Sequence, residues 1–167
     1  MTYLKLPFLI FLLIFLAPVS ADFSGLVVRI IDGDTIIVLD GSKKRKVRLT
    51  GIDAPELKQE FGLKSKQELA GLIDKKWVDI KSNSEDRYKR TLGKVICNGV
   101  DINLNLIKLG MTWHYKKYKQ TQSKKDQEEY AYHEKISKKG RIGLWENNNP
   151  IAPWDWRRGK RKNEQFN

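Results

Sequence analysis

Cysteine and histidine are scarce in this sequence of 167 residues, which contains one cysteine and two histidines. One cysteine cannot form an internal disulfide bond, so the chain is not a small domain held together by disulfides. The same scarcity excludes a cysteine-rich zinc module, and His114 and His133 lack the spacing of a metal-ligand pair. The length fits one domain with short appendages and excludes a long repeat array.

Acidic residues are also few relative to basic ones, with 20 Asp and Glu against 32 Lys and Arg and a formal net charge of +12. A positive surplus of this size attracts polyanions such as nucleic acid. Charge alone does not select one polyanion. An adhesin that binds anionic surface polymers through its basic end is therefore one alternative.

Residues 1–21 have the pattern of a secretory signal peptide. Lys5 precedes an apolar run over residues 6–19, and Ser20 and Ala21 supply small residues for a cut after Ala21. The alternative is an uncleaved membrane anchor, although the run is shorter than the roughly 20 residues of a membrane span. We expect a secreted or periplasmic protein, which contacts a membrane only if the leader remains attached.

The segment that follows has the pattern of β-strands. Residues 26–39 form two β-branched runs separated by Asp32-Gly33, which is typical of a tight primed turn with positive φ at both central residues. A third strand is predicted over residues 46–52. Three consecutive antiparallel strands are therefore expected.

Helices and two further strands are predicted along the rest of the domain. Apolar spacing of three and four predicts a helix over 61–73. Strands are expected over 77–80 and 92–96, a short helix over 104–109 before Gly110, and a long helix over 124–139. Five short strands with about three helices favour an α+β fold built on a five-stranded OB-type β-barrel.

The sequence divides into a leader (1–21), a domain (22–149) and a tail (150–167) that is rich in proline, tryptophan and basic residues. The tail has two open readings. Its aromatic rings and cations could bind nucleic acid, or its tryptophans could dock it on the domain. Within the domain, three tryptophans are expected in the core: Trp77, Trp113 and Trp145.

Two carboxylates lie where predicted neighbouring strands end. Asp34 leaves the hairpin turn and Asp53 follows the third strand, so the two side chains can converge at one end of the barrel. Oxygen ligands without histidine or cysteine nearby favour Ca²⁺ or Mg²⁺ over zinc. Two carboxylates do not fill the about six to eight oxygen positions of calcium, so waters and a substrate phosphate would complete the shell.

Four stretches, taken in order, resemble the staphylococcal nuclease (thermonuclease) family. They are Ile31–Thr35, Val47–Leu49, Ile52–Glu56 and Asp86–Arg90, and the similarity runs from about residue 24 to residue 145. The resemblance implies an OB-type barrel and a Ca²⁺-dependent endonuclease that hydrolyses DNA and RNA to 3′-phosphate and 5′-hydroxyl ends. It implies no protein partner, and we expect a monomer.

The resemblance assigns metal ligands residue by residue. It makes Asp34 and Asp53 carboxylate ligands of Ca²⁺ and the backbone carbonyl of Ala54 a third ligand. The family often has threonine at the last of these positions, and a main-chain ligand tolerates alanine there.

The resemblance also assigns the catalytic residues. It places Glu56 near the attacking water, as general base or as the group that orients the water, and Arg48 and Arg90 on the phosphate. Guanidinium groups suit this role because they donate bidentate hydrogen bonds to oxygens on which negative charge builds up.

Two departures from the family concern the surroundings of the site. Lys89 stands where the best-known members have glycine, and the connection between Glu56 and Gly62 is shorter than in the best-known member. Tyr118 and Tyr115 compete for the place of the aromatic residue at the nucleotide pocket.

A catalytically silent OB-fold module that binds nucleic acid is the alternative to an enzyme. Such a module has no need of the charged site residues. All five are present together in this chain, which favours the enzyme: Asp34, Arg48, Asp53, Glu56 and Arg90.

Overall fold

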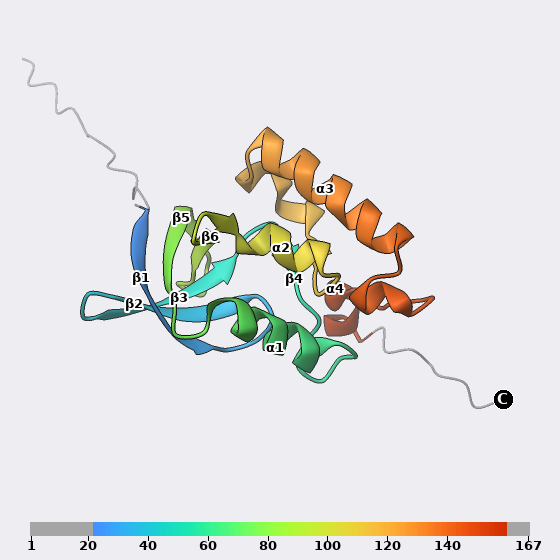
Figure 1. The fold of residues 1–167 in the computed structure, drawn as a ribbon, viewed down its shortest axis with the longest axis horizontal. Coiled ribbons are helices and arrows are strands. Elements are labelled where there is room, and N and C mark those ends of the chain that lie inside the picture. Colours follow the sequence, from blue (N-terminus) through green and yellow to red (C-terminus); the bar gives the residue numbers. More distant parts are fainter. Residues whose placement is uncertain (1–21, 160–167) are drawn as a thin grey trace, which may run out of the picture.

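The computed structural model describes residues 22–159. The predicted leader (1–21) and the basic end of the tail (160–167) lie outside the described residues. The strands gather at one end of the molecule, and the helices α3 (Lys124–Lys139) and α4 (Pro153–Arg157) lie at the other (Figure 1).

Five strands form a closed barrel, as the sequence predicts. They are hydrogen-bonded in the order β3-β2-β1-β5-β6, and an additional pairing between β3 and β6 closes the ring. This closing pair is parallel, whereas the other four pairings are antiparallel. The strands are β1 (Phe23–Ile30), β2 (Thr35–Asp40), β3 (Lys43–Leu49), β5 (Trp77–Glu85) and β6 (Thr91–Cys97).

Three very short strands complete the sheets. β7 (Val100–Asp101) extends the barrel sheet beside β6. β4 (Ile52–Asp53) and β8 (Trp113–His114) form a separate antiparallel pair, in which Asp53 lies opposite Trp113. This pair connects the end of the barrel to the segment that follows β8.

The predicted helices are confirmed as α1 (Gly62–Ile73), α2 (Ile102–Lys108) and α3. α3 begins where the Ser123 side chain accepts a hydrogen bond from the Asp126 N–H, as an N-cap residue does. Two 3₁₀ turns (Lys116–Thr121 and Gly143–Glu146) and α4 were not predicted. Among residues 22–159, no helix is long and apolar enough to span a membrane.

The core lies inside the barrel and continues under α1 and α2. Strand alternation decides which side chains face inward: Val78 and Ile80 are buried, whereas Trp77 on the same strand is 67% exposed. The expectation that Trp77 belongs to the core is therefore wrong, because its place in the strand alternation directs this large apolar side chain to the outside of the barrel. Trp145 is buried, as expected, and Trp113 is half-buried.

The predicted hairpin of β1 and β2 is confirmed, but the prediction of a primed turn between them is wrong. Neither Asp32 nor Gly33 has positive φ. Asp32 instead accepts a hydrogen bond from the Asp34 N–H through its side chain (3.0 Å). A Cβ on Gly33 would lie 2.7 Å from the Ala54 Cβ and would overlap the Ser65 hydroxyl, so glycine is required by close packing and not by the backbone angle.

Glu134 on α3 fixes the segment that follows β8. Its carboxylate accepts hydrogen bonds from the His114 N–H (3.0 Å) and from Lys116 (2.5 Å), and Lys138 lies 3.4 Å away. Burial alone would raise the pKa of Glu134, but the contacts with these two lysines and the His114 N–H outweigh burial and lower the pKa below its usual value. The ionised carboxylate therefore stabilises the fold.

Glu134→Gln is expected to lower the free energy of unfolding by about 1.5–3 kcal/mol at neutral pH, the usual range for a hydrogen bond to a charged group. Because the folded-state pKa is depressed, this contribution is complete above the unfolded pKa of about 4.3 and is lost as pH falls through the lower folded pKa. Urea unfolding at neutral and acidic pH measures it. The exposed Glu128→Gln on the same helix is the control, and a deficit that persists unchanged in acid would contradict the prediction.

Candidate active site

Arg48 lies between the two aspartates that the sequence predicts to converge. Its Nη2 atom is 2.9 Å from a carboxylate oxygen of Asp34 and 2.8 Å from one of Asp53. Its Nη1 atom donates to the carbonyl oxygens of Leu49 (2.6 Å) and Ile52 (2.9 Å). The structure therefore brings Asp34, Arg48 and Asp53 together at one end of the barrel.

Strand pairing explains this convergence. Thr35 on β2 lies opposite Arg48 on β3, so Asp34, one residue earlier, is next to the arginine. The Leu49 N–H donates to the Asp34 carbonyl (2.8 Å), and the Ala54 N–H donates to the Asp34 carboxylate (2.7 Å). The hairpin loop and the residues after β4 are thus joined through Asp34.

The two aspartates place more negative charge in the barrel end than Arg48 neutralises. Asp53 is 1% exposed and Asp34 is 6% exposed. Burial, with the charges of Asp32 and Asp53, raises the pKa of Asp34 to about 7 against the opposing effects of Arg48 and the Ala54 N–H. A cation near these carboxylates would relieve this excess.

Glu56 sits in a short turn between β4 and α1. Its carbonyl oxygen accepts from the Gln59 N–H (2.7 Å), and its N–H donates to the Gln59 side chain (3.1 Å). A Cβ on Gly62, the first residue of α1, would overlap the Glu56 carbonyl. The short connection between Glu56 and α1 therefore requires glycine at position 62. The side chain of Glu56 is 41% exposed.

Arg90 lies just before β6, beside the strand that carries Arg48. The parallel pairing puts Thr91 opposite Val47, so the two arginines lie near the closing seam of the barrel. Arg90 forms an ion pair with Asp86 at 2.6 Å. Lys89 between them has φ of 58°, in the left-handed region that favours glycine.

Both tyrosines considered for the nucleotide pocket lie on the segment after β8. The Tyr115 N–H donates to the Gly51 carbonyl (2.9 Å), which holds Tyr115 beside the strand end that leads to Asp53. The rings of Tyr115 and Tyr118 are in edge contact with centroids 5.5 Å apart. They form one aromatic cluster, to which Trp154 of α4 adds a third ring stacked on Tyr115 at 5.5 Å.

Arg157 is a site residue that the sequence analysis missed. Its Nη2 atom lies 2.7 Å from Asp53 and its Nη1 atom 2.7 Å from Glu56. The partly buried guanidinium has a raised pKa, because its bonds to these carboxylates outweigh the effect of burial. In sequence it belongs to the basic tail, and no spacing pattern marks it. Of the two readings of the tail, this contact and the stacking of Trp154 favour docking for residues 150–159.

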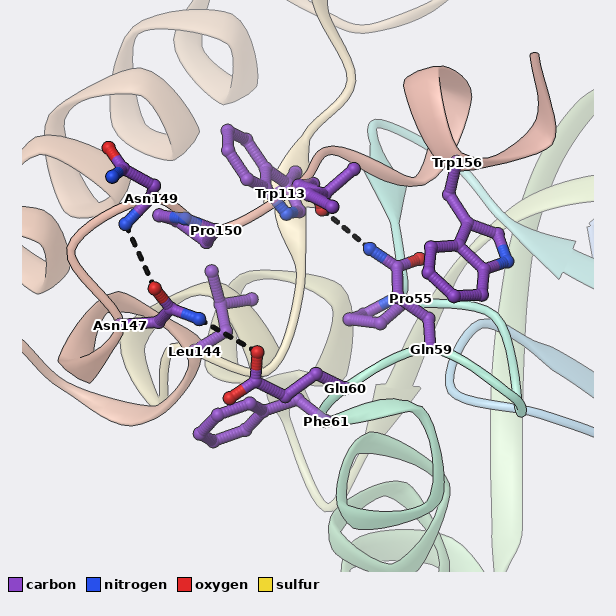
Figure 2. Close-up of a pocket in the computed structure, with 11 residues that line it drawn as sticks. Pro55, Gln59, Glu60, Phe61, Trp113, Leu144, Asn147, Asn149, Pro150 and Trp156 are labelled. Atoms are coloured by element: carbon purple, nitrogen blue, oxygen red, sulfur yellow. Dashed lines mark hydrogen bonds between the residues drawn. The ribbon is translucent and has the colours of Figure 1, made fainter. Parts of the chain in front are cut away.

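A cavity of about 630 Å³ adjoins the turn that carries Glu56. Figure 2 shows Pro55, Gln59 and Trp156 on one side of it and Asn147 and Pro150 on the other. Gln59 donates a hydrogen bond to the Ile151 carbonyl (2.5 Å). None of the predicted catalytic or metal-binding side chains lines it. The cavity is therefore next to the predicted catalytic and metal-binding residues but is not formed by them.

Within residues 22–159, no group of three or more His, Cys, Asp and Glu side chains is arranged to hold a metal ion. The donor set at the barrel end nevertheless fits a hard divalent cation. Asp34 and Asp53 are buried, supply only oxygen and meet at a single nitrogen of Arg48. A cation held by two carboxylates and the Ala54 carbonyl would keep several waters, as Ca²⁺ and Mg²⁺ can.

Comparison with known proteins agrees with the barrel and its charged end. The family model described as "Staphylococcal nuclease homologue" matches residues 46–147. An uncharacterized endonuclease of Haemophilus influenzae is 45% identical over 141 residues, which cover 84% of this chain and 76% of the relative. A micrococcal nuclease of Shigella flexneri is 40% identical over 158 residues, which cover 89% of this chain and 88% of the relative.

The OB-type barrel with carboxylates and arginines at one end defines a nuclease-like domain. The chain belongs to the staphylococcal nuclease family. Membership of this family supports the hydrolysis of nucleic acids as its activity. The matched residues include Arg48, Asp53, Glu56 and Arg90, whereas Arg157 lies beyond them.

Arg48→Ala is expected to lower the free energy of unfolding by about 3–5 kcal/mol, because it leaves two buried carboxylates without their shared partner. Arg45→Ala on the same strand removes a more exposed ion pair with Asp40 and should cost about 1 kcal/mol. Urea unfolding in the presence of chelator measures both. Equal losses for the two variants would contradict the buried role of Arg48.

Proposed function

We propose that the protein is a Ca²⁺-dependent endonuclease that hydrolyses phosphodiester bonds of DNA and RNA and leaves 3′-phosphate and 5′-hydroxyl ends. The observation that carries this proposal is the convergence of Asp34 and Asp53 on Arg48, with Glu56 on the adjoining turn. The names of the two relatives and the family match support the activity.

Asp34, Asp53 and the Ala54 carbonyl would hold the cation. When bound, a divalent ion neutralises negative charge on the phosphate and lowers the pKa of a coordinated water. Ala54 is 5% exposed and is fixed by its N–H bond to Asp34, so the proposed ligands form one rigid group.

Glu56 would take the proton of the attacking water. Its side chain is the most exposed of the three site carboxylates, and its backbone is fixed by Gln59. The water oxygen bonds to phosphorus, the bond from phosphorus to the 5′ oxygen breaks, and that oxygen leaves as a hydroxyl after gaining a proton from solvent. The products are therefore a 3′-phosphate and a 5′-hydroxyl.

Arg90 and Arg48 would stabilise the charge that develops on the phosphate oxygens. Arg90 is partly exposed and bound to Asp86, which orients its guanidinium. Arg48 contacts both proposed metal ligands, and its part in holding them is additional to its proposed contact with the phosphate. The aromatic cluster of Tyr115 and Tyr118 would stack against a base of the substrate.

The proposed site of action is outside the cytoplasm, in the periplasm or the medium. The basis is the leader pattern of residues 1–21 alone. A nuclease in either place would meet the nucleic acids of lysed cells.

Digestion of plasmid DNA and of RNA by the purified protein is expected to require Ca²⁺, to stop on addition of chelator and to return when Ca²⁺ is restored in excess. The products should accept a 5′ label from a polynucleotide kinase without prior phosphatase treatment. Activity that persists in chelator would contradict the metal assignment. Binding without cleavage under any condition would favour the silent nucleic-acid-binding module.

Glu56→Gln and Arg90→Ala are each expected to reduce the rate of DNA cleavage by about 10²–10³-fold at saturating Ca²⁺, the usual cost of one lost transition-state contact. Initial rates on a fluorogenic oligonucleotide measure the loss. Glu60→Gln, an exposed carboxylate that binds Asn147, is the matched control and should cleave at the wild-type rate. Wild-type rates for Glu56→Gln would overturn its role.

A further inference from the structure

The helix α4 places a cation on two carboxylates of the proposed site, the metal ligand Asp53 and the general base Glu56. Arg157 donates to Asp53 through both terminal nitrogens, at 2.7 and 3.4 Å, and to Glu56 at 2.7 Å. The other close partner of Asp53 is Arg48. Both carboxylate oxygens of Asp53 are therefore bound by arginine.

The position of Arg157 is set by packing of the whole segment. Ala152 and Pro153 at the start of α4 are buried. Trp154 contacts Trp113 at 5.5 Å and stacks on Tyr115. The Ile151 carbonyl accepts from Gln59 on the turn that carries Glu56. The packing of α4 against the domain thus holds Arg157 next to the two carboxylates.

A guanidinium and a divalent cation cannot both take the same carboxylate oxygens. They also repel each other at close range, so occupancy of Asp53 by one weakens the other. Arg157 has an exposed fraction of 43% and lines a cavity of about 430 Å³ with Glu56 and Asp32. The Arg157 end of the ion pair is open to solvent, whereas the Asp53 carboxylate is buried, so a divalent cation that replaces Arg157 must also neutralise Asp53.

We propose that Arg157 sets the metal affinity of the active site by competing with the divalent cation for Asp53. This inference rests on the proposed function. Metal binding releases the Asp53 carboxylate oxygen that Arg157 holds at 2.7 Å, and the guanidinium of Arg157 moves into the adjoining cavity. Arg157 is a positioning residue: it holds Asp53 and Glu56 in place and raises the Ca²⁺ concentration that the enzyme needs.

Calorimetric titration of Ca²⁺ into chelator-treated protein tests the competition without any turnover. Arg157→Gln is expected to bind Ca²⁺ about five- to tenfold more tightly than the wild type, the change that corresponds to about 1–1.4 kcal/mol. Arg157→Lys keeps the charge but lacks the bidentate donor geometry of arginine. Its Ca²⁺ affinity should therefore lie between those of the wild type and Arg157→Gln. Arg158→Gln, at the next and more exposed position, should bind like the wild type.

The Ca²⁺ concentration for half-maximal DNA cleavage should fall in Arg157→Gln by the same factor. A cooperative thermal transition close to that of the wild type shows that each variant is folded. If Arg157→Gln binds Ca²⁺ no more tightly than the wild type and Arg158→Gln, the competition is wrong and the proposed function stands. If the wild type binds no Ca²⁺ at any concentration tested, the proposed function and the competition both fail.

Discussion

The ion pairs of Arg48 with Asp34 and Asp53 are the interaction on which the active end of the barrel depends. They join the β1–β2 loop to β4 through β3, and β3 and β4 do not pair with each other. Buried charges of one sign need a partner of the other, because the low-dielectric interior does not solvate them. Arg48 therefore stabilises both carboxylates at this end of the barrel.

One arginine between two buried carboxylates leaves the site short of positive charge. Arg157 supplies positive charge to Asp53 in the folded chain, and a divalent cation would supply it in the proposed active state. Such a site gives up some stability of the isolated fold in return for binding and catalysis. Burial, together with the charges of Asp32 and Asp53, raises the pKa of Asp34 in the folded chain.

The barrel, the three longer helices and the meeting of Asp34 with Asp53 were predictable, because strand alternation and turn residues are local signals. The failures have tertiary causes. Gly33 is required by Ser65 and Ala54, which come from other segments. Arg157 reaches Asp53 across 104 positions of sequence from a helix of five residues, which is too short to show a periodic pattern.

The parallel pairing of β3 with β6 has a consequence for when the enzyme becomes active. It joins segments more than forty residues apart, from Val47 to Thr91, and the entropy of closing that loop must be overcome before the seam forms. Arg48 and Arg90 stand on either side of this seam. Until the barrel closes, Arg48 and Arg90 are not held next to each other, so the phosphate-binding site proposed for them is assembled only with the complete barrel.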